Sequence, residues 1–425
     1  MRIKLARPTS NTLRIELIFV SLLFIAFLFL VRKYQQYDIS IYYDYSLNLL
    51  KGQFPYTDFN FEYPPLALLP IALPQLPSVV QPLNFTAYAI LLFIQNAFFS
   101  HLIAVVLSRI IAAWQTKKAA IRTISFYAAL IVPNLIVVFC RYDIFAALLT
   151  VIAFWAVLKQ RPTQAGIWLG LGIAAKLYPV ALIPIFSIYY FTKRQYQASA
   201  KFLLGNILTV AVIFLPFALA AQEKFFSFLT YHRQRGLHIE TLPGGILLLL
   251  SKFGFIDASF ELNYGAFHFT SEIATPILKV LPILTWSLLG ITLFYCVKGF
   301  RQEYAASGEI TYRTLATYIT ITLLVFMITA KVFSPQYLVW VLPFLPLLRL
   351  NRITIAFITA ISVTTFLVYP VLYGRLLNLR IIALFVLNIR NVLIAAFAAY
   401  LLVDQSRNLS REAKKTSVEK AFTAQ

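Results

Sequence analysis

Runs of about 20 apolar residues recur from one end of the chain to the other, and they constrain the fold more than any other feature. A helix of this length crosses a hydrocarbon core of about 30 Å. Hydrophobic residues are 60% of the chain and charged residues 12%, against about 45–50% and about 25% in soluble domains. The runs lack the period-two alternation of barrel strands, and backbone in lipid must satisfy its own hydrogen bonds. The sequence therefore predicts an all-α polytopic membrane protein.

About twelve transmembrane helices are expected, joined into one domain, because no Gly/Ser linker or shift in composition divides the chain. We expect a single polytopic transmembrane domain over residues 1–403 and a basic cytoplasmic tail over residues 404–425. The two cysteines, Cys140 and Cys296, fall near opposite ends of their helices and should not meet. The predicted spans lie near residues 15–31, 84–112, 122–140, 143–158, 163–178, 179–192, 202–221, 277–297, 314–330, 337–348, 353–370 and 388–403.

The formal net charge of +21 follows the predicted topology. With the N-terminus inside, most of the 37 lysine and arginine residues fall in the inner loops and the tail, and most of the 16 acids fall outside. This is the positive-inside bias, which sets orientation and needs no nucleic-acid partner. Both termini are therefore expected in the cytoplasm. The inner loops are short and basic, whereas the outer loops are longer and chemically mixed, so any active site is expected on the outer face.

The first outer loop is the most polar segment near the membrane. Between Gln36 and Leu66 it carries Asp38, Asp44, Asp58 and Glu62, a quarter of the 16 acids of the chain. Carboxylates at the membrane surface could act as a base on a lipid-borne substrate. Three segments on the same face share a local form in which proline stands beside an aromatic residue: EYPPLALLP, KLYPVALIP and SPQYLVWVLP. Because proline fits the first turn of a helix, each is expected to start one.

Several cations on the outer face leave two interpretations open. Lys176 and Lys331 could extend to water along the membrane margin, or could bind an anionic headgroup. Arg141 and Asp143 could simply neutralise each other across a tight turn. A basic cluster could either cradle a phosphate or form a solvated loop attracted to anionic lipids; it comprises His232, Arg233, Arg235 and His238.

Several common functions find no sequence signal. No GxxxxGK[ST] or GxGxxG segment is present to hold a nucleotide, which argues against an ATP-driven pump. No HExxH and no cysteine-based zinc spacing occurs. Acids at the middle of the spans, typical of ion-coupled carriers, are scarce, although spans interrupted by proline keep a carrier open.

An ordered set of motifs resembles glycosyltransferase family 87, membrane enzymes of the GT-C superfamily. No single motif is specific, but together they run in the family's order over roughly residues 38–340. The matching positions are Asp38 and Tyr42; Gly52, Pro55 and Tyr56; Glu62 to Pro65; Arg141 to Asp143; Gly166 to Pro179, with Lys176 and Tyr178; His232 and Arg235; and Ser334 to Trp340, with Gln336.

The resemblance implies a GT-C hexosyltransferase with a catalytic first outer loop. Such enzymes move a sugar, often mannose, from a polyprenyl phosphate to a lipid or glycan acceptor outside the cytoplasm, with inversion. Asp38 matches the catalytic aspartate, and Asp44 and Glu62 are second candidates for the base. The first loop also looks like that of the first mannosyltransferase of GPI-anchor synthesis, where Asp-x-Asp is usual. Gln36 replaces the earlier acid, which argues against a divalent metal.

The donor phosphate needs cations as its bond breaks. The candidates are Lys176, His232, Arg233, Arg235 and Lys331, and the other outer-face candidates are Tyr42, Arg141, Asp143, Tyr178 and Gln336. Family association favours a bacterial inner membrane, and the charge bias then puts the active site on its periplasmic face. No cofactor is expected, with a divalent metal as the alternative. The main alternative is a carrier that moves a lipid or glycolipid without bond chemistry. A third interpretation is a ligase or polymerase that joins preassembled glycans.

Overall fold

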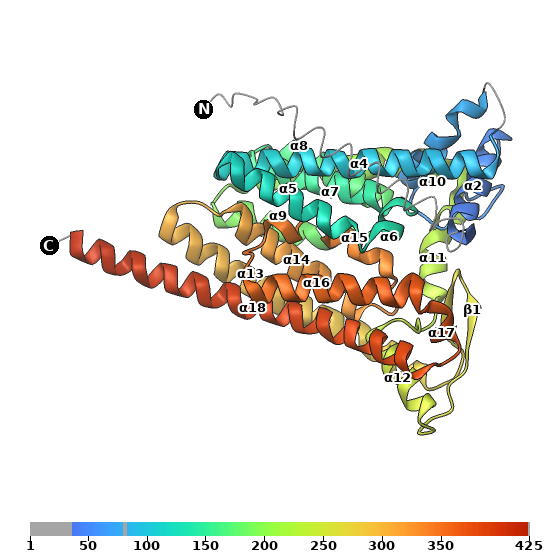
Figure 1. Cartoon of the computed structure of the whole chain (residues 1–425). Coiled ribbons are helices and arrows are strands. Elements are labelled where there is room, and N and C mark those ends of the chain that lie inside the picture. The colour runs from blue at the N-terminus through green and yellow to red at the C-terminus, as the bar shows by residue number, and fades with distance from the viewer. Residues whose placement is uncertain (1–35, 80–82, 424–425) are drawn as a thin grey trace.

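The structure, a computed structural model, describes residues 36–79 and 83–423. Helices dominate this part of the chain (Figure 1). The strands described are a single antiparallel hairpin, β1 (Phe260–Asn263) and β2 (Ala266–Phe269). The helical architecture agrees with the predicted fold class. The first predicted span, near residues 15–31, lies outside the described residues.

Six helices in the described ranges are long and apolar enough to cross a membrane. They indicate a multi-pass membrane protein, while the predicted number of twelve spans stays a prediction. The α10 span continues through the short η4 into α11, and η7 extends α16. The helices of these spans are α4 (Phe85–Trp114), α10 (Tyr196–Ala221), η4 (Gln222–Phe226), α11 (Ser227–Gln234), α13 (Ala274–Ser307), α14 (Tyr312–Thr329), α16 (Arg352–Phe366), η7 (Leu367–Val371) and α18 (Ile381–Thr423).

Shorter helices fill the space between the long ones. Four apolar segments, 143–158, 178–192, 242–252 and 335–347, fall below the length of the six spanning helices. The shorter helices are α2 (Gln36–Leu50), α3 (Leu68–Ala72), α5 (Lys117–Ile131), α6 (Leu135–Phe139), α7 (Asp143–Leu158), α8 (Pro162–Ala175), α9 (Ile183–Thr192), α12 (Leu242–Lys252), α15 (Leu338–Val341) and α17 (Tyr373–Leu377), with the 3₁₀ turns η1 (Pro65–Ala67), η2 (Leu73–Val79), η3 (Tyr178–Leu182), η5 (Pro335–Tyr337) and η6 (Leu345–Leu347).

The core is built around α7 and α14, whose residues are almost all buried. Helices α8 and α10 approach each other closely at glycines. A Cβ on Gly166 would collide with the backbone carbonyl of Phe202, and a Cβ on Gly205 would lie 2.8 Å from the carbonyl oxygen of Thr163. Small residues let transmembrane helices pack backbone to backbone. This contact holds the start of α8, the end away from Lys176, against α10.

All three proline segments start helices, as predicted. Pro65, Pro179 and Pro335 occupy the first turn of η1, η3 and η5, and each short 3₁₀ turn leads directly into α3, α9 or α15. Proline loses little there, because its missing N–H has no partner within the helix in any case. The residues that precede or begin these turns gather at one end of the molecule.

The two ends of the molecule differ. Helices α2, α11, α12 and α17 and the hairpin lie at one end, and the C-terminal part of α18 lies at the other (Figure 1). Helix α18 continues past residue 403, where the tail was expected to begin, to Thr423. Cys140 and Cys296 are buried and unpaired, which confirms that they do not meet.

Candidate functional site

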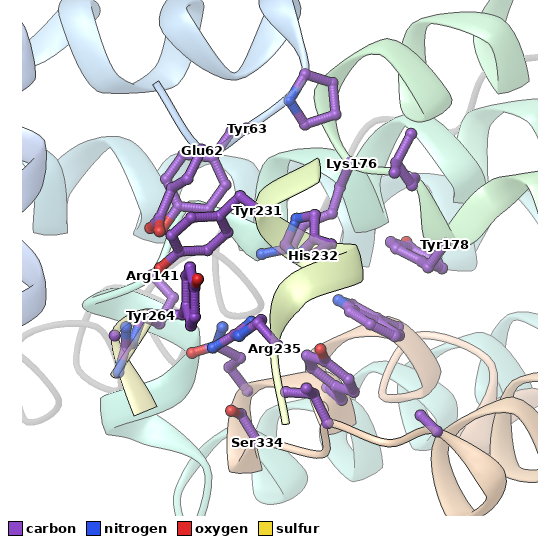
Figure 2. A pocket seen from close by; sticks show the side chains of 18 of the residues that line it. Glu62, Tyr63, Arg141, Lys176, Tyr178, Tyr231, His232, Arg235, Tyr264 and Ser334 are labelled. Carbon is purple, nitrogen blue, oxygen red and sulfur yellow. The ribbon is translucent and has the colours of Figure 1, made fainter. Parts of the chain in front are cut away.

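A cavity of about 320 Å³ opens at the end that carries α2 and α11. Its wall comes from separate parts of the chain: the start of α2, the segment before η1, the turns before α7 and after α8, α11, the hairpin, and the stretch from the end of α14 into α15. Figure 2 shows side chains from these segments, such as Tyr231, His232 and Arg235, around the cavity. The titratable residues with acidic or basic side chains that line it are Asp38, Glu62, Arg141, Lys176, His232, Arg235 and Lys331.

Asp38 forms an ion pair with Arg141. Asp38 lies in the first turn of α2, and Arg141 lies in the turn between α6 and α7. The amide of Asn96 holds that turn by donating to the carbonyl oxygens of Phe139 (2.8 Å) and Arg141 (3.1 Å). Arg141 Nη1 contacts Asp38 Oδ1, and both side chains are mostly buried. The interpretation in which Arg141 and Asp143 neutralise each other is therefore wrong, because each has a partner elsewhere in the chain.

Asp143 joins a cation to an indole. Its side chain is fully buried at the start of α7. Lys176 Nζ donates to Oδ2 at 2.8 Å, and Trp340 Nε1 donates to Oδ1 at 2.8 Å. The ammonium of Lys176 also lies 4.6 Å from the ring centre of Tyr142. Lys176 is thus partnered inside the protein, and the interpretation in which it merely extends to water is wrong.

Three stacked rings form an apolar wall. Trp340 stacks on Tyr178, with ring centres 4.4 Å apart and planes at 4°, and on Tyr337, with centres 4.0 Å apart and planes at 21°. The bond to Asp143 fixes the indole from one edge, and the hydroxyl of Tyr178 bonds to Thr150 at 3.1 Å. The wall therefore borders the cavity as a rigid, largely buried apolar surface whose ring faces pack against one another.

Two cations, Arg235 at the end of α11 and Lys331 after α14, meet in the cavity without a carboxylate partner among the described residues. Among the described residues, neither Arg235 nor Lys331 has an acid within ion-pair distance. Lys331 Nζ instead donates to the carbonyl oxygens of Arg233 (2.7 Å) and Arg235 (2.8 Å), which ties the residue after α14 to the end of α11. Burial, followed by the nearby charge of Arg235, lowers the pKa of Lys331. Within the described ranges, these two residues are therefore the lysine and arginine of the cavity that no carboxylate neutralises.

Glu62 is the cavity carboxylate that has no ion pair within the described ranges. It lies in the segment before η1 and interacts with the phenol of Tyr231 on α11. Figure 2 places Glu62 and Tyr231 together on one side of the cavity. A free carboxylate beside a phenol can bind sugar hydroxyls or accept a proton.

The structure separates the residues suggested by the sequence into two groups. Asp38, Glu62, Arg141, Lys176, Tyr178, His232, Arg235, Lys331 and Gln336 line the cavity. Four others do not. Asp44 and Arg233 have exposed side chains. Tyr42 is buried edge-on against Tyr142, and Asp143 lies behind the wall. Sequence reasoning did not select Tyr63, Tyr231, Tyr264 or Trp340 as site residues, although Tyr63 and Trp340 each belong to one of the motifs.

A buried ion cluster contains His238 from the predicted basic cluster, together with Arg390 and Glu240, which sequence reasoning missed. Arg390 is fully buried on α18, and its Nη2 donates to the carbonyl oxygen of Glu240 at 2.7 Å, with the carboxylate 3.5 Å from Nη1. The guanidinium lies over the ring of Phe333, whose carbonyl oxygen bonds His238 Nδ1 at 2.8 Å. Burial raises the pKa of Glu240 to about 7, although Arg390 opposes the rise. A charge inside an apolar run was the sequence signal for Arg390.

No group of three or more His, Cys, Asp or Glu residues is placed to hold a metal ion in the described part of the chain. The carboxylate of Asp38 is instead paired with Arg141, and that of Glu62 lies near the phenol of Tyr231.

The chain is similar to one known protein family. The model of glycosyltransferase family 87 matches residues 61–307, more than half of the 425 residues. The matched region includes Glu62, Arg141, Lys176 and Arg235, begins after Asp38 and ends before Lys331. A search among curated proteins found no match.

Proposed function

Since this chain belongs to glycosyltransferase family 87, we propose that it transfers a hexose, mannose in the first instance, from a polyprenyl phosphate to a lipid or glycan acceptor. The observation that carries the proposal is the cavity itself, where Asp38 and Glu62 face the uncompensated cations Arg235 and Lys331 beside an aromatic wall. Such a set offers a base for the acceptor and positive charge for a leaving phosphate. We assign the fold to the GT-C class on the same grounds.

Asp38 is the proposed general base. The acceptor hydroxyl oxygen attacks the anomeric carbon, its proton passes to the carboxylate, and the bond from that carbon to the phosphate oxygen breaks with inversion. Arg141 contacts Asp38 Oδ1, so we assign the proton to Oδ2. Glu62 is the competing base, because it lies inside the family match and carries no ion pair among the described residues.

Arg235 and Lys331 are proposed to bind the phosphate of the donor. Negative charge grows on that phosphate as the sugar leaves, and fixed cations in a partly water-excluded space stabilise it. His232, which lines the same wall, can add a hydrogen bond. Lys176 already neutralises Asp143 and therefore contributes less net charge. The mechanism we propose uses these cations and no metal ion.

The charge distribution supports an outer-face site with both termini inside. The cavity lies where α7 begins and where α8 and α14 end. Lys159 and Arg161 lie beyond the other end of α7, and Lys193 and Arg194 follow the far end of α9. Basic loops of this kind favour the cytoplasmic side. We therefore propose that the cavity lies on the outer face of the membrane. By family association we further propose a bacterial inner membrane and one transmembrane catalytic domain.

The test compares two isosteric variants, Asp38→Asn and Glu62→Gln, reconstituted in liposomes with radiolabelled donors. Mannosyl-, glucosyl- and arabinosyl-phosphoprenol are offered in parallel, with a membrane lipid extract as acceptor. A positioned base contributes about 10²–10⁴ in rate, so Asp38→Asn should lose that factor while Glu62→Gln stays within about tenfold. Size-exclusion profiles check that both variants fold.

The outcomes separate the alternatives. Full transfer by Asp38→Asn would refute the assignment of the base, and loss confined to Glu62→Gln would move it to Glu62. A protein that translocates a labelled glycolipid and leaves it chemically intact would be a carrier instead.

A further inference from the structure

A second space, which we call the arginine groove, opens at the end of α16. It has a volume of about 720 Å³ and is formed by η7, α17 and the turn that follows. Its polar lining residues are Tyr369, Tyr373, Arg375, Asn378 and Arg380. Ligand sites in proteins are commonly about 300–1,000 Å³, so a headgroup of several rings fits in this volume.

The backbone places both arginines in this groove. The N–H of Arg380 donates to the carbonyl oxygen of Arg375 at 2.9 Å, so the chain folds back on α17. The amide of Asn378 donates to the carbonyl oxygen of Gly374 at 2.7 Å and fixes the same turn. Both arginine side chains are exposed. Neither has a carboxylate within ion-pair distance in the part of the chain that the structure describes.

The groove lies next to the proposed base. Tyr369 and Tyr373 are close enough to Asp38 and Arg141 to interact electrostatically with both. Asp38 and Arg141 in turn line the cavity directly. The Asp38–Arg141 pair therefore lines the cavity and lies within electrostatic range of the groove tyrosines.

The chemistry of the groove points to an anionic, hydroxylated ligand. Two guanidinium groups bind phosphate oxygens in pairs. The side-chain carbonyl oxygen of Asn378, whose amide nitrogen donates to Gly374, can accept a hydrogen bond from a sugar or polyol hydroxyl. The cavity already contains cations for one phosphate, Arg235 and Lys331, so the groove provides a second, separate place for another.

We propose that the arginine groove binds the phosphodiester headgroup of the acceptor lipid and presents one of its hydroxyls to Asp38. This inference rests on the proposed function, which needs two lipid substrates to meet at one base. Arg375 and Arg380 hold the phosphodiester, and the acceptor approaches Asp38 from the α17 side while the donor occupies the cavity.

The experiment uses the full chain in phosphatidylcholine nanodiscs that contain a phosphatidylglycerol analogue with a photoreactive headgroup. After irradiation, labelled peptides are mapped by mass spectrometry in the wild type, in Arg375→Gln/Arg380→Gln, and in Lys252→Gln. Lys252 is an exposed cation at the end of α12 that lines neither space, and it serves as the matched control. Because both arginines are exposed, the double variant should fold, which size-exclusion profiles check.

We expect labelling of residues 367–380 to fall by about tenfold or more in the double variant, because hydrogen bonds to charged groups are lost, and to persist in Lys252→Gln. In the transfer assay, the double variant should raise the KM of the lipid acceptor by a similar factor and leave the KM of the donor unchanged. Labelling that spreads around the membrane belt and is unaffected by the double variant would overturn the proposal.

Two further outcomes are distinguishable. Inorganic phosphate that displaces the label as effectively as phosphatidylglycerol would identify a site for the free anion and overturn the lipid proposal. Specific labelling without sugar transfer from any donor would refute the proposed function and leave the binding site standing, because labelling needs no catalysis.

Discussion

Asp143 is the residue whose replacement tests the structure of the site most directly. Its carboxylate is fully buried and accepts from Lys176 Nζ and Trp340 Nε1, each at 2.8 Å. Asp143→Asn keeps the shape and an acceptor oxygen but removes the charge. Lys176 is then left as a positive charge whose side chain is only 14% exposed. The variant should therefore fold less stably without any change in side-chain volume.

The magnitude follows from the geometry. At 2.8 Å and an effective dielectric of about 20, the two charges attract by about 6 kcal/mol. Desolvation of each ion offsets much of this, so the useful quantity is the cost of removing one partner, about 3–5 kcal/mol. Lys176→Met should cost a similar amount, because it leaves Asp143 charged and buried. The double variant removes both charges and should cost much less than the sum of the two.

The assay is unfolding by sodium dodecyl sulfate in mixed micelles, followed by circular dichroism, for the wild type, both single variants and the double variant. Glu223→Gln, an exposed acid in η4, is the control and should stay within about 0.5 kcal/mol of the wild type. The expected coupling energy is about 2 kcal/mol or more. Single-variant costs that simply add, within about 0.5 kcal/mol, would refute the buried pair.

Two further predictions concern the hairpin and the helix packing. Burial, with a smaller effect of Arg235, lowers the pKa of His268 from 6.5 to about 4. Neutral His268 therefore contributes fully to the free energy of unfolding above pH 6.5, and this contribution, up to about 3 kcal/mol, is lost as the pH falls through 4. Hydrogen exchange over residues 260–269, corrected for intrinsic rates, should rise as the pH falls from 6.5 to 4 in the wild type and much less in His268→Gln. Equal pH profiles of the two proteins would contradict the role of His268. Gly166→Ala should destabilise the protein by about 1–3 kcal/mol through overpacking against α10. Gly290→Ala, with open space at its Cβ, should be neutral or stabilising. Equal effects of the two variants in detergent-induced unfolding would contradict the close approach of α8 to α10.

Periodicity and local chemistry made part of the fold predictable. Apolar runs predict helices because every backbone group in lipid must be bonded within its own segment. The prolines predict helix starts for an equally local reason, and η1, η3 and η5 confirm it. Span counting is less secure, because a short apolar helix such as α15 is difficult to distinguish by composition from part of a spanning one.

The contacts of the site could not be predicted in the same way. Arg141 and Asp143 are two positions apart, yet the first pairs with Asp38 and the second with Lys176 and Trp340. Sequence distance favours the local pair, whereas burial favours whichever arrangement satisfies every charge at once. That arrangement depends on how α2, α7, α8 and α15 pack, which no motif encodes.

The same packing separates cations that look equivalent in the sequence. Lys176 and Lys331 both end an apolar run and both precede a proline segment. Lys176 meets the buried carboxylate of Asp143, so its charge is already balanced. Lys331 meets only backbone carbonyl oxygens among its hydrogen-bond partners in the described chain, which orient the ammonium without cancelling its charge. A phosphate entering the cavity therefore gains more from Lys331 and its neighbour Arg235 than from Lys176. We accordingly expect Lys176 to act mainly through the position of Trp340 and the integrity of the cavity, and Lys331 to act on the donor.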